Sequence, residues 1–148
     1  MRILISACLL GARCRYDGVS KLQPWISDLA ERHILVPVCP EQLGGLPTPR
    51  PPAERRGDRV VTQTGDVTAQ YRRGAEETLK LCQLLGCKAA VLKERSPSCG
   101  CGAVYDGTFT GTLTAGDGVT AALLQAHGIR VLGESQGLEL LAPDGEKP

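Results

Sequence analysis

The sequence predicts a single α/β domain built around a mostly parallel sheet, and three observations support this prediction. Short apolar runs of strand length alternate with longer segments of helical spacing, which is the pattern of parallel strands joined by right-handed crossovers. Aromatic residues make up only 3% of the chain, so Leu, Val, Ile and Ala must form the core, as is common where helices cover such a sheet. No repeat, linker or change of composition divides residues 1–148, a length that suits one domain.

Four apolar runs are expected to form the strands: residues 2–6, 34–38, 88–92 and 129–132. Helical spacing predicts three helices between them. The first covers residues 24–33 and starts with a proline, which is favoured in a first helical turn. The second begins at the N-cap Asp66 and ends at Gly86, and the third begins at the cap Asp117 and stops at Gly128.

The remaining segments are expected to be irregular or short. Residues 40–57 are rich in Pro and Gly and should form a long loop, a feature that is usually functional or disordered. Within it, Arg50 and Glu54 could form an internal ion pair that fixes the loop, or contact substrate. Four further expectations are a minor edge strand at 59–62, a hairpin arm at 108–112, a helical turn at 138–141 and a frayed tail at 143–148.

Charge and hydropathy argue against several classes of function. The formal net charge is +1, so electrostatics predicts neither nucleic-acid nor membrane binding. No apolar run approaches the roughly 20 residues that span a bilayer. The N-terminal MRILISACLL is too short for a signal peptide and runs into GARCRYDG without a small-residue cleavage site. We therefore expect a cytoplasmic protein with a small-molecule partner, while the oligomeric state stays open.

The chain has seven cysteines, an odd number that cannot all pair. Without a secretion signal, metal binding or catalysis is a better interpretation than a disulfide framework. Cys82, on the apolar stripe of the second helix, and Cys87, at the entry of a strand, are expected to be small core residues. Cys14 matches no metal motif by its spacing, and Cys101 could be a spare ligand, a resolving thiol or a mere neighbour of Cys99.

Cys8, Cys39 and Cys99 each follow a strand-like run. Because parallel strands end at the same edge of a sheet, these thiols are expected to converge. Zinc and an iron–sulfur cluster are the candidate groups, since both bind thiolates. A close C-x-x-C pair is absent, and His33 and His127 lie at helix C-termini, where histidine usually complements the helix dipole. Three thiolates with one open coordination position therefore favour a catalytic centre.

Polar residues beside these cysteines are the catalytic candidates. Glu41 lies two residues after a candidate ligand, and a carboxylate there is a natural general acid or base. Ser96 and Ser98 precede Cys99, and either hydroxyl could hold a substrate oxygen or a water, although Ser-Pro is also ordinary turn chemistry.

Five segments resemble, in order, one family of small bacterial proteins: SACLLGARCRYDG, CPEQLGGLPTPRPPAE, GDVT, LKERSPSCG and YDGTFTG. This family, long known only as a domain of unknown function, includes thiouracil desulfidases, and the match covers nearly the whole chain. The resemblance implies a Rossmann-like, three-layer fold with a [4Fe-4S] cluster on three cysteines, which match Cys8, Cys39 and Cys99. It also implies catalytic roles for a glutamate and a serine, which match Glu41 and Ser96.

Together these observations predict an enzyme that removes sulfur from a thiolated heterocycle such as 2-thiouracil without redox change. The thiocarbonyl sulfur would bind the open iron, which acts as a Lewis acid, and would be released as sulfide. Glu41 would move protons and Ser96 would help to place the substrate. Two alternatives stay open: a zinc- or cluster-binding structural module acting through a protein partner, and a thiol redox protein using Cys99 and Cys101.

Overall fold

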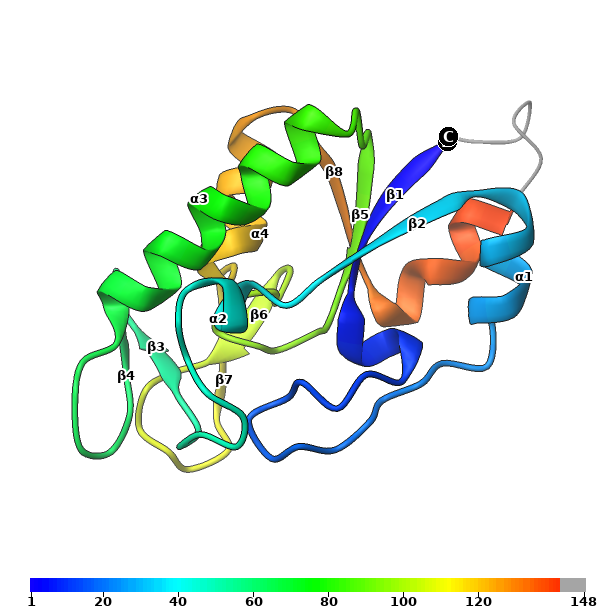
Figure 1. Cartoon of the computed structure of the whole chain (residues 1–148). Coiled ribbons are helices and arrows are strands. Elements are labelled where there is room, and N and C mark those ends of the chain that lie inside the picture. The colour runs from blue at the N-terminus through cyan, green and yellow to red at the C-terminus, as the bar shows by residue number, and fades with distance from the viewer. Residues whose placement is uncertain (142–148) are drawn as a thin grey trace.

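The computed structural model describes residues 1–141, and its centre is a four-stranded sheet. The strands are β1 (Arg2–Ser6), β2 (Ile34–Val38), β5 (Ala89–Leu92) and β8 (Arg130–Gly133), in the order β2-β1-β5-β8 (Figure 1). Every neighbouring pair in this sheet is parallel. The prediction of an α/β fold with a mostly parallel sheet is therefore confirmed. The predicted tail, residues 143–148, lies outside the described residues.

Helices cover both faces of the sheet and give the molecule three layers (Figure 1). The helical elements are α1 (Ile26–Arg32), α2 (Pro40–Leu43), α3 (Thr68–Leu84), α4 (Val119–Ala126) and the 3₁₀ turns η1 (Ala7–Leu10) and η2 (Glu134–Leu141). Helices α3 and α4 lie on one face, while α1 and η2 lie on the other. In the described part of the chain, no helix has the length and apolar character needed to cross a membrane.

Alternate residues of β1 pack into two separate cores, because successive side chains of a strand point to opposite faces of the sheet. Ile3 and Ile5 pack in one core with Leu29 of α1. Leu4 packs in the other core with Leu124 of α4. The central strand is therefore buried on both faces, as expected for a parallel sheet between two helical layers.

The connections contain more regular structure than the sequence predicts. The expectation of one irregular loop at 40–57 is wrong: the segment begins with α2 and ends with β3 (Glu54–Arg56). Strand β3 pairs antiparallel with β4 (Arg59–Val61), so the predicted edge strand belongs to a separate hairpin. The expected hairpin arm at 108–112 is the connection between the paired strands β6 (Ala103–Tyr105) and β7 (Leu113–Ala115).

Each aspartate predicted as a helix cap lies one residue before the observed N-cap. Oδ1 of Asp66 accepts the Thr68 N–H at 2.8 Å, but the N-cap residue of α3 is Val67, so the prediction that Asp66 is the N-cap is wrong by one residue. Oδ1 of Asp117 instead accepts the N–H of Gly102 at 2.8 Å, and α4 begins after Gly118 without a side-chain cap. The prediction that Asp117 caps this helix is therefore wrong, because its side chain bonds to a neighbouring loop.

The carboxyl ends of β1 and β5 form the switch point of the sheet. From β1 the chain passes through α1 to β2 at one edge, and from β5 it passes through α4 to β8 at the other. In open α/β sheets, ligands bind in the crevice at such a point. The Lys93 N–H donates to the Ser6 hydroxyl at 2.9 Å and joins the two strand ends.

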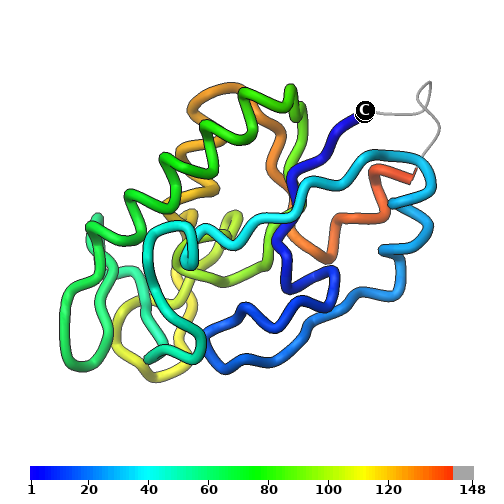
Figure 2. The backbone as a smooth tube through the Cα atoms, viewed as in Figure 1, coloured from blue at the N-terminus to red at the C-terminus, as the bar shows by residue number. Residues whose placement is uncertain are grey.

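Short helix α2 is held at this end by close packing against α3. A Cβ on Gly44 would lie 2.0 Å from the Gln70 carbonyl oxygen, and a Cβ on Gly74 would lie 1.9 Å from that of Pro40. Only glycine permits so close an approach of two backbones. The loop after α2 runs beside the loop after β1 (Figure 2), where the Arg50 N–H donates to the Tyr16 carbonyl at 2.9 Å.

Candidate metal centre and catalytic site

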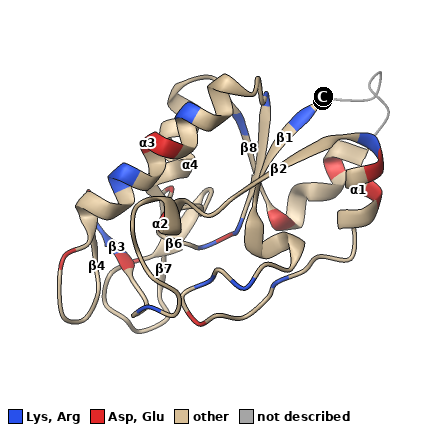
Figure 3. Ribbon diagram, in the orientation of Figure 1, with Lys and Arg blue, Asp and Glu red and all other residues tan. Residues whose placement is uncertain are grey.

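A cavity of about 560 Å³ is lined by residues that follow β1, β2 and β5. Its walls include all five residues that the sequence analysis selected as ligands or catalytic groups: Cys8, Cys39, Cys99, Glu41 and Ser96. The loops around this end of the sheet carry residues of both charge signs (Figure 3). The cavity is therefore not surrounded by a field of one sign.

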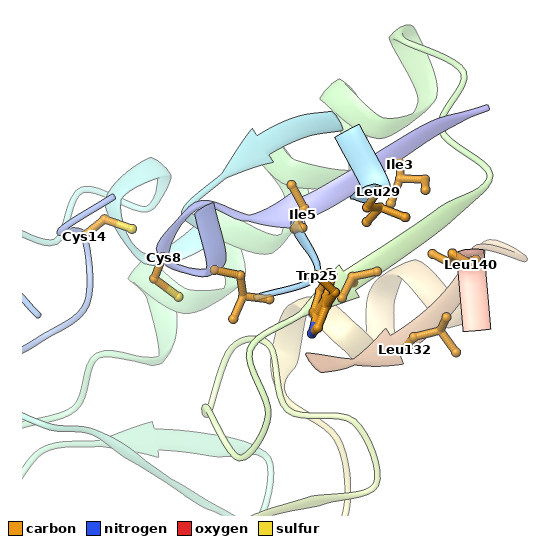
Figure 4. Packing of buried hydrophobic residues seen from close by; sticks show 10 residues of the cluster. Ile3, Ile5, Cys8, Cys14, Trp25, Leu29, Leu132 and Leu140 are labelled. Atoms are coloured by element: carbon orange, nitrogen blue, oxygen red, sulfur yellow. The ribbon is translucent and has the colours of Figure 1, made fainter. Parts of the chain in front are cut away.

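Cys8 lies in η1, directly after β1. Gly11 ends this turn with φ 97°, in the left-handed region that glycine adopts without a Cβ penalty. The Cys8 carbonyl accepts the N–H groups of Gly11 at 3.1 Å and Lys21 at 3.0 Å. These bonds fold the chain back and fix Cys8 at the end of the strand. Figure 4 shows Cys8 and Cys14 at one end of the core cluster, away from Leu140.

Cys39 is the N-cap residue of α2 and has extended backbone angles. Pro40 follows at the first helical position, where its fixed φ favours the start of a helix. The Cys39 thiol donates to the Cys14 carbonyl at 3.6 Å. Because Cys39 and Glu41 belong to one short helical segment that packs on α3, a single structural element places both residues.

Cys99 lies in a tight turn that Ser96 organises. Oγ of Ser96 accepts the N–H groups of Ser98 and Cys99, both at 3.1 Å, and the Ser96 carbonyl accepts the Gly100 N–H at 2.8 Å. Side-chain acceptors of this kind are typical of turns. Ser96 therefore holds the backbone of Cys99 while it also lines the cavity.

The structure distinguishes the two candidate serines by their surroundings. Ser98 is 1% exposed, and its hydroxyl shares a hydrogen bond of 2.8 Å with the Thr120 hydroxyl of α4. It is not among the residues that line the cavity. Ser96 is the serine that faces the site.

Cys14 is a cavity residue that no sequence pattern marks as a candidate ligand. It lines the same cavity, is 7% exposed, and its thiol contacts the thiols of Cys8 and Cys39. No close C-x-x-C spacing marks it, because a loop rather than a strand end brings it to the site. Its position in the same short loop as Cys8 was the available signal.

The pKa values of three cavity thiols lie above their ordinary value. Burial, followed by the nearby Glu41 carboxylate, raises the pKa of Cys99 to about 12. The bond with Cys14 and burial raise the pKa of Cys39. Contact with Cys39 lowers the pKa of Cys14, but Cys8 and burial outweigh it, so that this pKa is also raised. These thiols are protonated at neutral pH without a metal, and metal binding must release their protons.

Glu41 is the polar centre of the cavity wall. Its Oε2 accepts hydrogen bonds from Nε of Arg50 at 2.9 Å and from Nη2 at 2.5 Å, while its Oε1 accepts the Ser96 hydroxyl at 3.3 Å. Tyr71 of α3 also contacts this carboxylate; its own pKa is raised by burial and then by the charge of Glu41. Two side chains from different parts of the chain, Arg50 and Ser96, therefore hold the carboxylate by hydrogen bonds.

Arg50 uses its whole guanidinium group to connect this site. Besides Glu41, its nitrogens donate to the carbonyls of Pro47 at 3.1 Å and Cys14 at 3.0 Å, and to the Thr48 hydroxyl at 3.0 Å. Burial lowers the pKa of Arg50, but Glu41 outweighs it and raises the pKa. The expected ion pair between Arg50 and Glu54 is wrong, because the partner of Arg50 is Glu41.

Aromatic side chains gather at this cavity. The chain has five aromatic residues, Trp25, Phe109, Tyr16, Tyr71 and Tyr105, and all except Trp25 line the cavity. Trp25 lies instead in the core against Leu29. In a chain so poor in aromatics, this concentration favours a planar ligand that stacks on ring faces.

The other three cysteines lie outside the cavity. Cys82 and Cys87 are buried in the core on the α3 and α4 side of the sheet, as their sequence contexts predict. The Cys101 thiol contacts the side-chain amide of Gln125 at 3.3 Å and the Val131 carbonyl at 3.8 Å. Cys99 faces the cavity, and Cys101 does not.

The donor set fits an iron–sulfur cluster. Among residues 1–141, no three Cys, His, Asp or Glu side chains are arranged to hold one metal ion. A cluster takes one thiolate on each of several irons. Thiols spread around a cavity beside a switch point match that requirement.

Known proteins share this fold and sequence. The sequence model of the 2-thiouracil desulfurase family matches residues 3–136. The chain is 43% identical over 150 residues to the "Uncharacterized protein YbbK" of Bacillus subtilis (strain 168), covering 94% of this chain and 99% of that protein. Among solved structures, the [4Fe-4S]-dependent thiouracil desulfidase TudS matches with a TM-score of 0.89 at 54% sequence identity, covering 94% of each chain. The chain belongs to the 2-thiouracil desulfurase family.

Proposed function

We propose that this protein is a [4Fe-4S]-dependent enzyme that cleaves the C–S bond of a thiolated heterocycle such as 2-thiouracil. Cys8, Cys39 and Cys99 are the proposed cluster ligands, and one iron is left without a protein ligand. Family membership and the likeness to a [4Fe-4S]-dependent thiouracil desulfidase support this reaction class.

One observation carries the proposal: a fixed carboxylate and a serine hydroxyl line the same cavity as the candidate ligands. Glu41 and Ser96 share a hydrogen bond of 3.3 Å, and Cys8, Cys39 and Cys99 line the cavity beside them. A structural metal module has no need of an acid–base pair in an open cavity. An enzyme that must move protons beside a metal centre does.

The chemistry divides between the cofactor and the chain. When bound, the cluster supplies a Lewis-acidic iron that holds the substrate sulfur and polarises the C–S bond, and soft sulfur suits iron better than a hard cation. Glu41 moves protons between the ring nitrogen and an attacking water. Ser96 donates to Oε1 of Glu41, so it orients the carboxylate and helps to place the substrate. Arg50, on Oε2, holds the carboxylate from the other side.

The test is anaerobic reconstitution with ferrous iron and sulfide, removal of excess reagents, and incubation with 2-thiouracil. We expect full iron loading and release of hydrogen sulfide with formation of uracil. Metal-free protein should release none. A protein that binds only zinc would contradict the proposed cofactor, and a fully loaded protein that releases no sulfide would contradict the proposed reaction.

The thiol redox alternative makes the opposite prediction for metal-free protein. It requires a reversible bond between Cys99 and Cys101, yet only Cys99 lines the cavity. Activity of metal-free protein that disappears on thiol alkylation would favour that alternative.

A further inference from the structure

Two non-glycine residues among those described have a positive φ angle: Arg95 at 68° and Phe109 at 59°. Both line the cavity. This left-handed backbone is unfavourable for side chains other than Gly, Asn and Asp. Such strain persists only where the surroundings enforce it, and it is concentrated at functional sites.

The surroundings that enforce it at Phe109 come from strand β3. Oε1 of Glu54 accepts the Phe109 N–H at 3.2 Å and the Gly107 N–H at 3.0 Å. The Gly107 carbonyl accepts a hydrogen bond from Nη2 of Arg56 at 2.6 Å. A Cβ on Gly107 would lie 2.8 Å from the Arg55 carbonyl oxygen, so the loop packs directly on β3. In Figure 2 this yellow loop lies beside the green-blue β3 segment.

The loop has a polar side and a cavity side. Phe109 and Gly111 line the cavity. Three threonines that do not line the cavity form a chain of hydroxyls, with Thr108 to Thr110 at 2.6 Å and Thr110 to Thr112 at 2.8 Å. Because glycine has no side chain, Phe109 is the residue through which this loop contributes a side chain to the cavity wall.

The other aromatic residues of the cavity are less suited to bind a ring. Tyr71 is 3% exposed and contacts Glu41. The Arg15 guanidinium lies over the Tyr16 ring at 5.5 Å from its centroid, so one face of that ring is already covered. Tyr105 lies in regular strand β6 and carries no comparable backbone restraint.

We propose that Phe109 is the platform on which the planar ring of the substrate stacks, and that Glu54 is the residue that positions it. This inference rests on the proposed function, because it names the binding group for that substrate. Neither residue takes part in the chemical step. Glu54 acts through the backbone of the loop, and Phe109 acts through its ring face.

The test compares variants that keep the backbone and change the ring. Phe109→Asn tolerates the left-handed backbone and removes the ring, whereas Phe109→Tyr keeps it. We expect Phe109→Asn to raise KM for 2-thiouracil about tenfold, the order seen for loss of one stacking contact, with little change in kcat because binding is lost equally in ground and transition states. Phe109→Tyr should stay near the parent value.

Glu54 is tested by removing its acceptor. Glu54→Gln keeps an oxygen for the two N–H groups and should stay near the parent KM, while Glu54→Ala should raise KM and speed hydrogen exchange at the Gly107 and Phe109 amides. If Glu54 acts only through Phe109, the double variant Glu54→Ala/Phe109→Asn should show no further rise in KM.

Failure of this inference can be told apart from failure of the proposed function. If the parent protein releases sulfide and Phe109→Asn has the parent KM, the inference is wrong and the function stands. If the loaded parent protein releases none, equilibrium dialysis with 2-thiouracil still compares the two proteins. Equal dissociation constants for the two proteins, or no binding to the parent protein, would then contradict the proposed role of Phe109. A loss of binding in Phe109→Asn alone would support it. Thermal unfolding checks that each variant is folded.

Discussion

Two groups of cysteines in this chain are both shielded from solvent, but only one group lines the cavity. Cys82 and Cys87 are 0% and 2% exposed and pack in an apolar core, where the Cys82 thiol donates to the Cys87 carbonyl at 3.6 Å. Cys8 and Cys99 are each 5% exposed, yet they line a cavity that also contains Glu41. Burial raises the pKa of Cys82 to about 11 and that of Cys99 to about 12.

Neither burial nor thiol pKa therefore separates a candidate ligand from a core residue in this fold. Position does: the candidate ligands follow strand ends beside the switch point, where polar side chains meet them. The core cysteines fill space between a helix and the sheet. Removing a thiol from the cavity and removing one from the core should consequently have different effects.

The largest difference is expected for cluster binding. Cys8→Ala, Cys39→Ala and Cys99→Ala should each lose the cluster, because a thiolate bond to iron has no replacement in alanine. The measurement is iron and acid-labile sulfide per protein after anaerobic reconstitution, together with visible absorption. Cys82→Ala is the matched control and should keep full loading with a modest loss of thermal stability.

Cys14 makes this comparison sharper, because its thiol contacts those of Cys8 and Cys39 inside the cavity. Cys14→Ala should keep the cluster if the three strand-end cysteines are the ligands. Loss of iron from Cys14→Ala, with retention in one of the other three variants, would place Cys14 in the ligand set instead.

The next largest effect is expected at Glu41. Glu41→Gln keeps the size of the side chain and removes its ability to accept a proton, so turnover should fall about 10²- to 10⁴-fold while iron content is unchanged. Glu77→Gln is the control, because it makes the same Glu-to-Gln change at the surface of α3, where Glu77 forms an ion pair with Lys80. Parent-like turnover in Glu41→Gln would remove this residue from the proton transfers.

The contrast between cavity and surface also applies to ion pairs and their contribution to the free energy of unfolding. The buried pair of Arg50 and Glu41 contrasts with the exposed pair of Arg59 and Asp66. The Arg50 side chain is 4% exposed and that of Glu41 is 14% exposed, whereas the pair of Arg59 and Asp66 is 55% and 41% exposed. Breaking a buried pair leaves an uncompensated charge, so Arg50→Ala should lower the free energy of unfolding by about 3 to 5 kcal/mol. Arg59→Ala should change it little, because exposed pairs are screened by water. Urea denaturation of metal-free proteins measures both, and equal losses would contradict this division.

The sequence was informative wherever a local pattern determines the outcome. Cys8, Cys39 and Cys99 could be found because apolar runs mark strands and parallel strands end together. Arg50 and Cys14 could not be assigned, because their bond joins loops 36 residues apart and no periodicity records it. Helix α2 is not predicted, because the segment 40–57 that contains it is rich in Pro and Gly. The close contact of Gly44 with α3 stabilises a helix there.

The smallest effect is expected at Cys101, two residues from Cys99 and outside the cavity. Its thiol contacts Gln125 and the Val131 carbonyl, so Cys101→Ala should keep the cluster and the parent turnover, with a stability loss of about 1 kcal/mol or less. Sulfide release and iron content measure the first two quantities, and urea denaturation measures the third. A thiol redox mechanism would make Cys101→Ala as inactive as Cys99→Ala. Cys99 and Cys101 are two residues apart in the sequence, but only Cys99 lines the cavity. A large difference in turnover between Cys99→Ala and Cys101→Ala would therefore show that location at the cavity, rather than the pair of neighbouring thiols, determines function.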